Sequence, residues 1–318
     1  MARFLTEDHV RQLLPMDEAL AQVEACFHAL GTGAARNQPR RRIRLPDGMM
    51  HVMSAGDVGL GVFGHKVYTT TRKGAKFLVT LYSTEDGRPL AVLEAGLLGA
   101  IRTGAASGIA AKYLARPDAA VLGVLGTGRQ APTQIQAVCA VRPISQVLVY
   151  SRNAERRKAF AEEMADSLGI PVTAAGSAQE TVESADVVAA ITDSKQPLLA
   201  GAWLKPGAHV NAAGNNMLAE QELDTEVFRR AWLITTDSLE GAKLECGDLL
   251  AAVEPGIVQW EDVVEIGQVV AGRHPVNDRP ADAITVYESQ GIAAEDLYAA
   301  VHVLRKAEAQ GIGTELPF

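Results

Sequence analysis

A glycine-rich turn between an apolar segment and a helix-like segment constrains this fold most. Residues Ala119–Leu125 form a continuous apolar run, which is typical of a buried parallel strand, and the chain continues at once with Gly126-Thr127-Gly128-Arg129-Gln130-Ala131. In this pattern the first glycine permits a tight turn, the second lets a pyrophosphate approach the backbone, and Ala131 keeps helix and strand close. The turn therefore predicts a dinucleotide site at a helix N-terminus, and a purely structural turn is the alternative.

Strand-like and helix-like segments alternate after this turn. Short apolar runs predict strands at 146–150, near 172, and at 186–191, 209–213 and 232–236, and the charged segment 154–168 predicts a helix. Such alternation favours a Rossmann-type, doubly wound parallel sheet of the α/β class. Thr192 and Ala213 stand where two of these strands end, so both are further candidates for cofactor binding.

The chain before residue 117 has a different pattern, in which helix-like and strand-like segments do not alternate. Thr6 begins a predicted capped helix, a second helix is expected over about 17–30, and β-like runs separated by Asp/Gly turns fill 43–92. A helix at 97–114 ends at Arg116-Pro117-Asp118, and a final amphipathic helix at 293–310 has no strand after it. We expect two domains: an α+β domain of residues 1–116, completed by 286–318, and a Rossmann domain of residues 117–285.

The end of the second predicted strand indicates which dinucleotide is preferred. An NAD site normally has Asp or Glu there, about 20 residues past the glycines. This chain instead has Ser151 and Arg152, with Arg156 soon after. A carboxylate would repel a 2′-phosphate, whereas an arginine pairs with one. The residues favour NADP(H) over NAD(H), and arginines at a solvated helix start are the alternative interpretation.

Composition excludes several classes of protein. The 318 residues are 47% hydrophobic and 21% charged, which excludes intrinsic disorder, and the net charge of −8 argues against a nucleic-acid partner. The longest apolar runs are too short for a membrane span. Cys26, Cys139 and Cys246 fit neither a disulfide framework nor a zinc pattern, and no metal-ligand spacing is evident. We expect a reduced, cytoplasmic protein without a metal.

Several further segments occur in a characteristic order. They are Arg102-Thr103-Gly104-Ala105-Ala106, Lys205-Pro206-Gly207-Ala208-His209-Val210-Asn211-Ala212, Glu245-Cys246-Gly247-Asp248 and Ser289-Gln290-Gly291. Together with the glycine turn they resemble the ornithine cyclodeaminase/μ-crystallin family over nearly the whole chain. The resemblance implies a homodimer whose subunits have a Rossmann domain and a discontinuous substrate and dimerisation domain. It also implies bound NAD(P) and an amino-acid or cyclic-imine substrate.

The resemblance assigns roles to three cationic residues. Arg41 resembles the family arginine that holds the substrate carboxylate, and Lys66 resembles the lysine that approaches the same carboxylate and the reacting carbon. Arg102 resembles an arginine near substrate and cofactor. A planar guanidinium matches a carboxylate, and a lysine among cations loses its proton more easily, so the chemistry is reasonable in itself. From the residues alone, the carboxylate clamp remains open among Arg40, Arg41, Arg42 and Arg44.

Asn216 marks a departure from the family pattern. In cyclodeaminases and related alanine dehydrogenases this loop carries an aspartate that handles the substrate amine, and an amide cannot act as a carboxylate base. Glu245 is a candidate for facing the substrate, against the alternative of a solvated helix carboxylate. Ser289 is a candidate for approaching the nicotinamide, or belongs to a simple turn.

The resemblance implies an enzyme that transfers hydride between nicotinamide and an amino acid or imine, and the cationic residues are consistent with it. It would be a ketimine reductase or an amino-acid dehydrogenase. Ornithine cyclodeamination, a lyase reaction that forms proline and ammonia, is the first alternative. A non-catalytic protein that binds NADP(H) or another ligand is the second.

Overall fold

The structure is a computed structural model that describes residues 2–317, and it contains two compact units. Unit 1 runs to Arg102 and resumes at Gly291, whereas unit 2 comprises Thr103–Gln290. The first division falls inside helix α3 (Gly96–Leu114), whereas the sequence places a boundary at the break that follows this helix.

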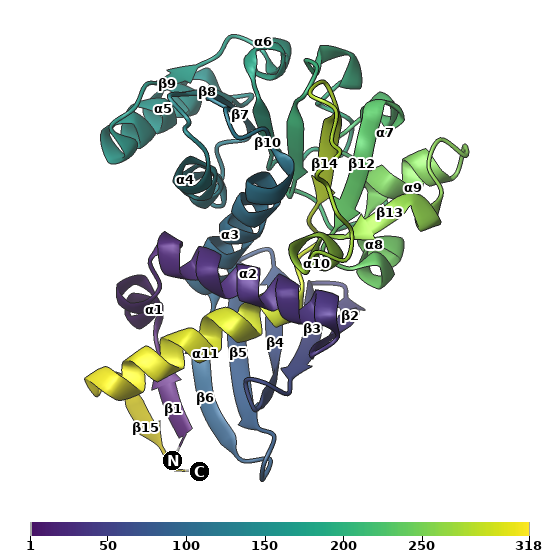
Figure 1. The fold of residues 1–318 in the computed structure, drawn as a ribbon. Coiled ribbons are helices and arrows are strands. Elements are labelled where there is room, and N and C mark those ends of the chain that lie inside the picture. Colours follow the sequence, from purple (N-terminus) through teal and green to yellow (C-terminus); the bar gives the residue numbers. More distant parts are fainter. Residues whose placement is uncertain (1, 318) are drawn as a thin grey trace. The chain divides into compact units, whose positions relative to one another are not determined.

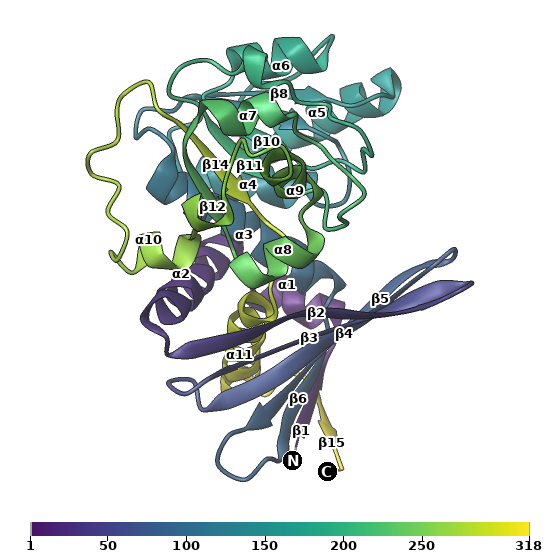
Figure 2. The same ribbon diagram turned by 90° about the vertical axis from the view of Figure 1, so that its right-hand side faces the viewer.

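Unit 1 contains a seven-stranded sheet in the order β15-β1-β6-β5-β4-β3-β2. Strands β2 to β6 form an antiparallel meander, and β1 pairs in parallel with β6 (Figure 2). The register between β2 and β3 shifts between Gln38 and Arg41, which marks an irregularity in β2. The strands are β1 (Ala2–Leu5), β2 (Ala35–Leu45), β3 (Gly48–Asp57), β4 (Val62–Thr71), β5 (Gly74–Ser83), β6 (Pro89–Glu94) and β15 (Thr314–Leu316).

Three helices of unit 1 pack with this sheet. They are α1 (Glu7–Leu13), α2 (Met16–Thr32) and α11 (Ala293–Gln310), and Figure 1 shows α2 and α11 lying across the strands. The Thr6 side chain accepts from the His9 amide and caps α1, which confirms the predicted helix start. The expectation that no strand follows the last helix is wrong, because β15 pairs with β1. Gly311, in the left-handed conformation, ends α11 and lets the chain reach that edge.

Unit 2 contains an eight-stranded sheet in the order β13-β12-β14-β11-β10-β7-β8-β9. All its pairs are parallel, so the predicted Rossmann-type α/β sheet is confirmed. Chain order reverses between the neighbours β7 and β10, since β8 and β9 continue on one side and the later strands on the other. The strands are β7 (Val121–Leu125), β8 (Gln146–Tyr150), β9 (Val172–Ala174), β10 (Val187–Ala190), β11 (His209–Ala212), β12 (Ala231–Thr236), β13 (Val263–Glu265) and β14 (Ile284–Glu288).

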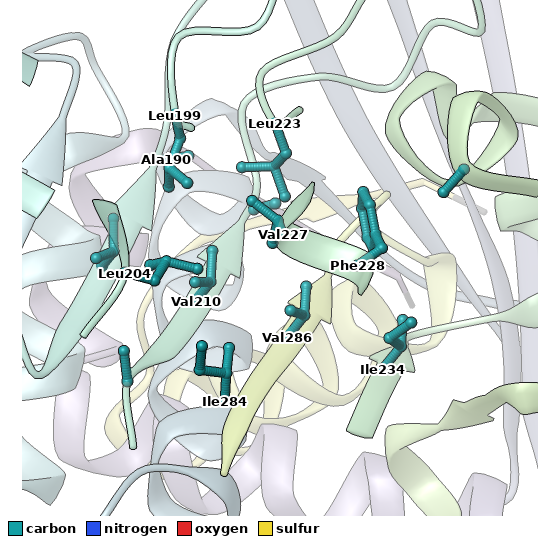
Figure 3. Close-up of a cluster of buried hydrophobic side chains, with 14 of the residues drawn as sticks. Ala190, Leu199, Leu204, Val210, Leu223, Val227, Phe228, Ile234, Ile284 and Val286 are labelled. Carbon is teal, nitrogen blue, oxygen red and sulfur yellow. The ribbon is translucent and has the colours of Figure 1, made fainter. Parts of the chain in front are cut away.

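Two apolar clusters bury the sheet of unit 2. Val187 and Ala189 belong to one cluster, and Val188 and Ala190 belong to the other, as alternation along a strand buried on both faces requires. Figure 3 shows the second cluster, where Leu199 and Leu223 lie near Ala190. The helices are α4 (Ala131–Val141), α5 (Ala154–Leu168), α6 (Ala178–Ser184), α7 (Thr225–Arg230), α8 (Leu239–Glu245), α9 (Gly247–Val253) and α10 (Ile266–Val270), with short 3-10 turns η1 (Gly201–Trp203) and η2 (Trp260–Asp262).

Within residues 2–317, no helix combines the length and the apolar composition that crossing a membrane requires. The longest of these helices, α3, is rich in alanine and glycine.

Candidate active site

A cavity of about 520 Å³ lies at the carboxyl ends of β7, β8 and β10, where the chain order of the sheet reverses. This is the place where open α/β sheets bind their ligands. Gly126 has φ +107°, and a Cβ there would lie 2.3 Å from the Ile191 carbonyl oxygen, so only glycine fits the turn. A Cβ on Gly128 would meet nothing within 4 Å. The backbone at Gly128 is therefore open to a bulky group such as a pyrophosphate.

The cavity brings together most of the predicted cofactor residues. Its lining includes Gly126, Thr127, Gly128, Arg129, Gln130, Ser151, Arg152, Arg156 and Thr192. Thr127 Oγ1 donates to Ser151 Oγ at 3.0 Å, which links the turn after β7 to the end of β8. Ala131 is buried at the start of α4, as its proposed packing role requires, and it does not line the cavity. Ala213 and Ser289 are also buried and do not line it.

Sequence reasoning missed part of this lining, namely Tyr150, Asn153, Ile191, Asp193, Ser194, Leu198 and Gly214. Asp193 matters most, because its carboxylate forms an ion pair with Arg152 at 3.1 Å. The two side chains are 88% and 84% exposed, so the pair lies at the mouth of the cavity in open solvent. Asp193 follows β10 in the chain, so a search for an acid after the second strand does not find it.

Unit 1 contains a buried group of charged side chains. Lys66 on β4 lies 2.8 Å from Asp296 on α11, and Arg102 on α3 contacts Asp296 at 3.1 Å. Arg102 also pairs with Glu295 at 2.6 Å. Side-chain exposure in these pairs does not exceed 7%, so each charge depends on its partners rather than on water.

The pKa of the Lys66 ammonium group is lower than that of an ordinary lysine. Burial lowers its pKa to about 8, and the neighbouring Arg102 and Arg40 contribute in the same direction. The charge and hydrogen bond of Asp296 oppose this change. Lys66 therefore gains and loses a proton close to neutral pH, which is a property of groups that move protons or bind anions.

The structure does not bring Arg41 together with Lys66. Arg41 pairs with Val52, whereas Lys66 pairs with Met53, and adjacent strand residues point to opposite faces of a sheet. Arg41 is also exposed. Arg40, by contrast, is 7% exposed and contacts the Met53 sulfur at 3.4 Å.

Arg40 is thus the buried arginine of this segment, and it lies beside Met53 on the face that carries Lys66. Its guanidinium also donates to the Gly291 carbonyl at 3.0 Å. The Arg40 Cζ and Lys66 Nζ atoms lie 6.0 and 5.9 Å from the centroid of the Tyr68 ring. The His51 ring stacks on the Tyr68 ring, with 4.0 Å between the two centroids. Burial, together with Arg42 and Arg40, lowers the pKa of His51 to about 4, so its ring is neutral at pH 7.

The remaining candidates lie in unit 2. Glu245 is the last residue of α8 and is 2% exposed, which does not match a solvated helix carboxylate. Asn216 is half-buried in the loop after β11. Glu288, at the end of β14, accepts a hydrogen bond from the Cys246 thiol at 3.5 Å, and burial raises its pKa well above the ordinary range.

The fold and the cavity together define a protein of the Rossmann type with a nucleotide-sized site at the glycine turn. The sequence profile of the ornithine cyclodeaminase/mu-crystallin family matches residues 2–311. The chain therefore belongs to this family, as its motifs predicted.

Three relatives illustrate the similarity. The chain is 32% identical to alanine dehydrogenase of Archaeoglobus fulgidus over 99% of this chain and 98% of that protein. The Thermococcus litoralis Δ1-pyrroline-2-carboxylate reductase, solved with NADH and L-proline, has a TM-score of 0.93 and 32% identity, covering 99% and 100% of the two chains. An archaeal alanine dehydrogenase dimer with bound NAD has a TM-score of 0.93 and 33% identity, covering 100% and 99%. These relatives are one reductase and two alanine dehydrogenases, and the two solved structures contain NADH or NAD.

Proposed function

We propose that this protein is an NAD(P)-dependent oxidoreductase that interconverts an α-imino acid and an α-amino acid. The observation that carries the proposal is the open cavity at the glycine turn, built at the switch point of a parallel sheet. The buried cations of unit 1 and the reductase and dehydrogenase relatives support the same reaction class.

The residues of the cavity fit a nicotinamide dinucleotide. Gly126 and Gly128 leave room for a pyrophosphate beside the backbone, and the N-terminus of α4 favours its negative charge. Arg129, Gln130 and Thr192 would hold further parts of the nucleotide. When bound, the nicotinamide supplies or accepts the hydride, which no side chain does.

The residues of unit 1 would bind the carboxylate that every α-amino and α-imino acid carries. Arg40 provides a planar, bidentate donor, and Lys66 provides a compact cation. Asp296 and Glu295 hold Lys66 and Arg102 in place through the ion pairs described above. Because the pKa of Lys66 is about 8, its Nζ also holds a proton that is exchangeable near the working pH. Arg41 stays a sequence-based prediction for the same role.

We further propose that NADP(H) is preferred over NAD(H). Arg152 and Arg156 both line the cavity beside Ser151, where a 2′-phosphate on the adenosine ribose would need cationic partners. The Arg152–Asp193 ion pair competes with such a phosphate. Asp193 would therefore moderate the preference rather than abolish it.

We propose a homodimer formed through unit 1. Strands β2, β4 and β5 expose large apolar side chains to solvent, and such a group is typical of a surface that binds another protein chain. These side chains are Ile43 (59%), Leu45 (67%), Phe63 (46%) and Leu78 (45%). The archaeal alanine dehydrogenase relative was solved as a dimer.

The cysteines Cys26, Cys139 and Cys246 are free, which supports the expected reducing, cytoplasmic location.

A spectrophotometric screen tests the proposed reaction. Purified protein is given NADH or NADPH with pyruvate plus ammonia, or with cyclic imino acids such as Δ1-pyrroline-2-carboxylate, and loss of absorbance at the nicotinamide band is followed. Sustained cofactor oxidation by one of these substrates is expected. Release of proline and ammonia from ornithine without net cofactor oxidation would instead show the lyase reaction. Nucleotide binding without any turnover would favour the non-catalytic alternative.

A further inference from the structure

Glu222 lies in the segment between β11 and α7 and is 1% exposed. It does not line the nucleotide cavity, yet it contacts three residues that do, namely Thr192, Leu198 and Gly214. A buried carboxylate is costly, so its position needs hydrogen-bond partners.

The side chain of Glu222 fixes Thr192. Glu222 Oε1 accepts from the Thr192 backbone amide and from Thr192 Oγ1, both at 2.7 Å. Thr192 Oγ1 in turn accepts from the Ser194 amide at 3.1 Å, which sets the turn after β10. Glu222 Oε1 thus fixes the position of Thr192 and, through Thr192, the turn that forms this wall of the cavity.

Gly214 approaches the same carboxylate from the loop after β11. The Gly214 amide faces the carboxylate and lowers its pKa. A Cβ at Gly214 would lie 2.2 Å from Glu222 Oε2 and 2.5 Å from the Thr192 amide nitrogen, so the three residues are packed without spare room. Glycine is required here by close approach.

The backbone of Glu222 fixes another part of the wall. Its carbonyl accepts from the amides of Leu198 at 2.8 Å and Leu199 at 2.9 Å. Its amide donates to Asp248 Oδ1 at 2.8 Å, and Asp248 is itself buried on α9. Asp248 therefore holds the backbone of Glu222, and Glu222 in turn holds Leu198 in the cavity wall.

We propose that Glu222 is a positioning residue for the nicotinamide cofactor, and that it acts through Thr192 and Gly214. Two donors of Thr192 converge on Oε1, and Oε2 lies against Gly214 without a hydrogen-bond partner among residues 2–317. The ionised carboxylate is the stronger acceptor for both Thr192 donors, so a proton on the carboxyl weakens its hold on Thr192. The inference rests on the proposed function, because it assumes that the cavity binds NAD(P)H.

The surroundings of Glu222 make its charge sensitive to pH. Burial raises the pKa of Glu222 to about 7, the charge of Asp248 adds to this, and the Thr192 and Gly214 donors oppose it. Glu288 on β14 is a further acidic neighbour, and Asp237 after β12 is near Glu288 in turn. The cavity wall at Thr192 and Gly214 should therefore be well ordered above pH 7, where Glu222 is ionised, and less ordered below pH 7, where it is protonated.

Titration of NADH and NADPH against the full-length protein, between pH 6 and 8, tests the proposal. For wild type we expect affinity to fall as the pH drops below 7. For Glu222→Gln we expect about tenfold weaker binding at pH 8 and little dependence on pH, with a larger effect on the cofactor KM than on kcat. The matched control is Glu220→Gln, because Glu220 is two residues away and its carboxylate only approaches Lys195, at 3.8 Å.

Thr192→Val provides a second, independent test. It removes one donor to the carboxylate, which raises the pKa of Glu222. The pH below which NADH affinity falls should therefore move upward, and this test stands even if Glu222→Gln does not fold.

The outcomes separate the two proposals. If wild type binds no nicotinamide nucleotide, the proposed function fails. If wild type binds normally and Glu222→Gln matches Glu220→Gln at every pH, only the role of Glu222 fails. An unchanged pH profile in Thr192→Val would also overturn that role.

Discussion

Buried charges are arranged differently in the two units. In unit 1, Lys66 and Arg102 are paired with Asp296 and Glu295, so opposite charges satisfy one another. In unit 2, Glu222 lies near Asp248 and Glu288, and like charges raise one another's pKa. The first arrangement holds the cations in position, as the proposed binding of a substrate carboxylate requires. The second keeps protons on carboxyl groups and makes them respond to pH.

The largest expected effect comes from breaking the ion pairs of unit 1. Asp296→Asn leaves the Lys66 ammonium buried beside Arg102 without its carboxylate partner, and we expect a loss of about 3–5 kcal/mol in the free energy of unfolding. Chemical denaturation at pH 7 measures it. Asp8→Asn is the matched control in the same unit, because the Asp8–Arg11 pair is exposed and should change little. Equal, small losses for both variants would contradict the pairing argument.

Lys66→Met tests whether this cluster serves catalysis. We expect turnover to fall about 100- to 1,000-fold while NADPH still binds, because the cation proposed to bind the substrate carboxylate is lost. Lys76→Met removes the same charge from an exposed position on β5 and should leave turnover unchanged. Normal turnover in Lys66→Met would remove Lys66 from the proposed mechanism.

Arg40 and Arg41 offer a comparison between the two faces of one sheet. Arg40→Ala should raise the substrate KM about 10- to 100-fold, since a hydrogen-bonded charge is lost from the face that carries Lys66. Arg41→Ala should change it little, because Arg41 is exposed on the opposite face. Steady-state kinetics on both variants decides the assignment. The reverse order of effects would restore the clamp to Arg41.

Arg152→Ala tests cofactor choice in unit 2. We expect NADPH affinity to fall about tenfold and NADH affinity to stay within about twofold, because only NADPH carries the 2′-phosphate. Asp193→Asn should favour NADPH, since it frees Arg152 from its ion pair. Equal losses for both nucleotides in Arg152→Ala would argue against the preference.

Glu288→Gln gives the smallest expected effect and completes the comparison with Asp296→Asn. The folded-state pKa of Glu288 is raised, so its contribution to stability is present at low pH and is lost as the pH rises above its unfolded value of about 4.5. The variant removes this loss, and its free energy of unfolding at pH 8 should equal or exceed that of wild type, by on the order of 1 kcal/mol. Denaturation at pH 5 and pH 8 measures the difference. A large loss at both pH values would show that Glu288 is a needed ion.

The sequence predicted local features well. The glycine turn at Gly126–Ala131 encodes its conformation within six neighbouring residues, and the apolar run Ala119–Leu125 precedes it. The capped start of α1 and the alternating elements of unit 2 are local signals of the same kind. The family was predicted from several short motifs that occur in a characteristic order along the chain.

The sequence could not predict what tertiary contacts decide. The irregularity in β2 determines that Arg40 rather than Arg41 shares a face with Lys66, and no local pattern marks it. Asp193 and Glu222 reach the cavity region from segments far from the glycine turn. β15 spans Thr314–Leu316 and forms because the edge of β1 is available to it.

Transfer of isotope tests the account most directly. Cofactor carrying deuterium at the reactive C4 position of the nicotinamide is incubated with the protein and the imino acid that the screen identifies. Mass spectrometry should then find one deuterium on the α-carbon of the amino acid formed. An amino acid without deuterium, produced while labelled cofactor disappears or remains intact, would contradict hydride transfer to the imine.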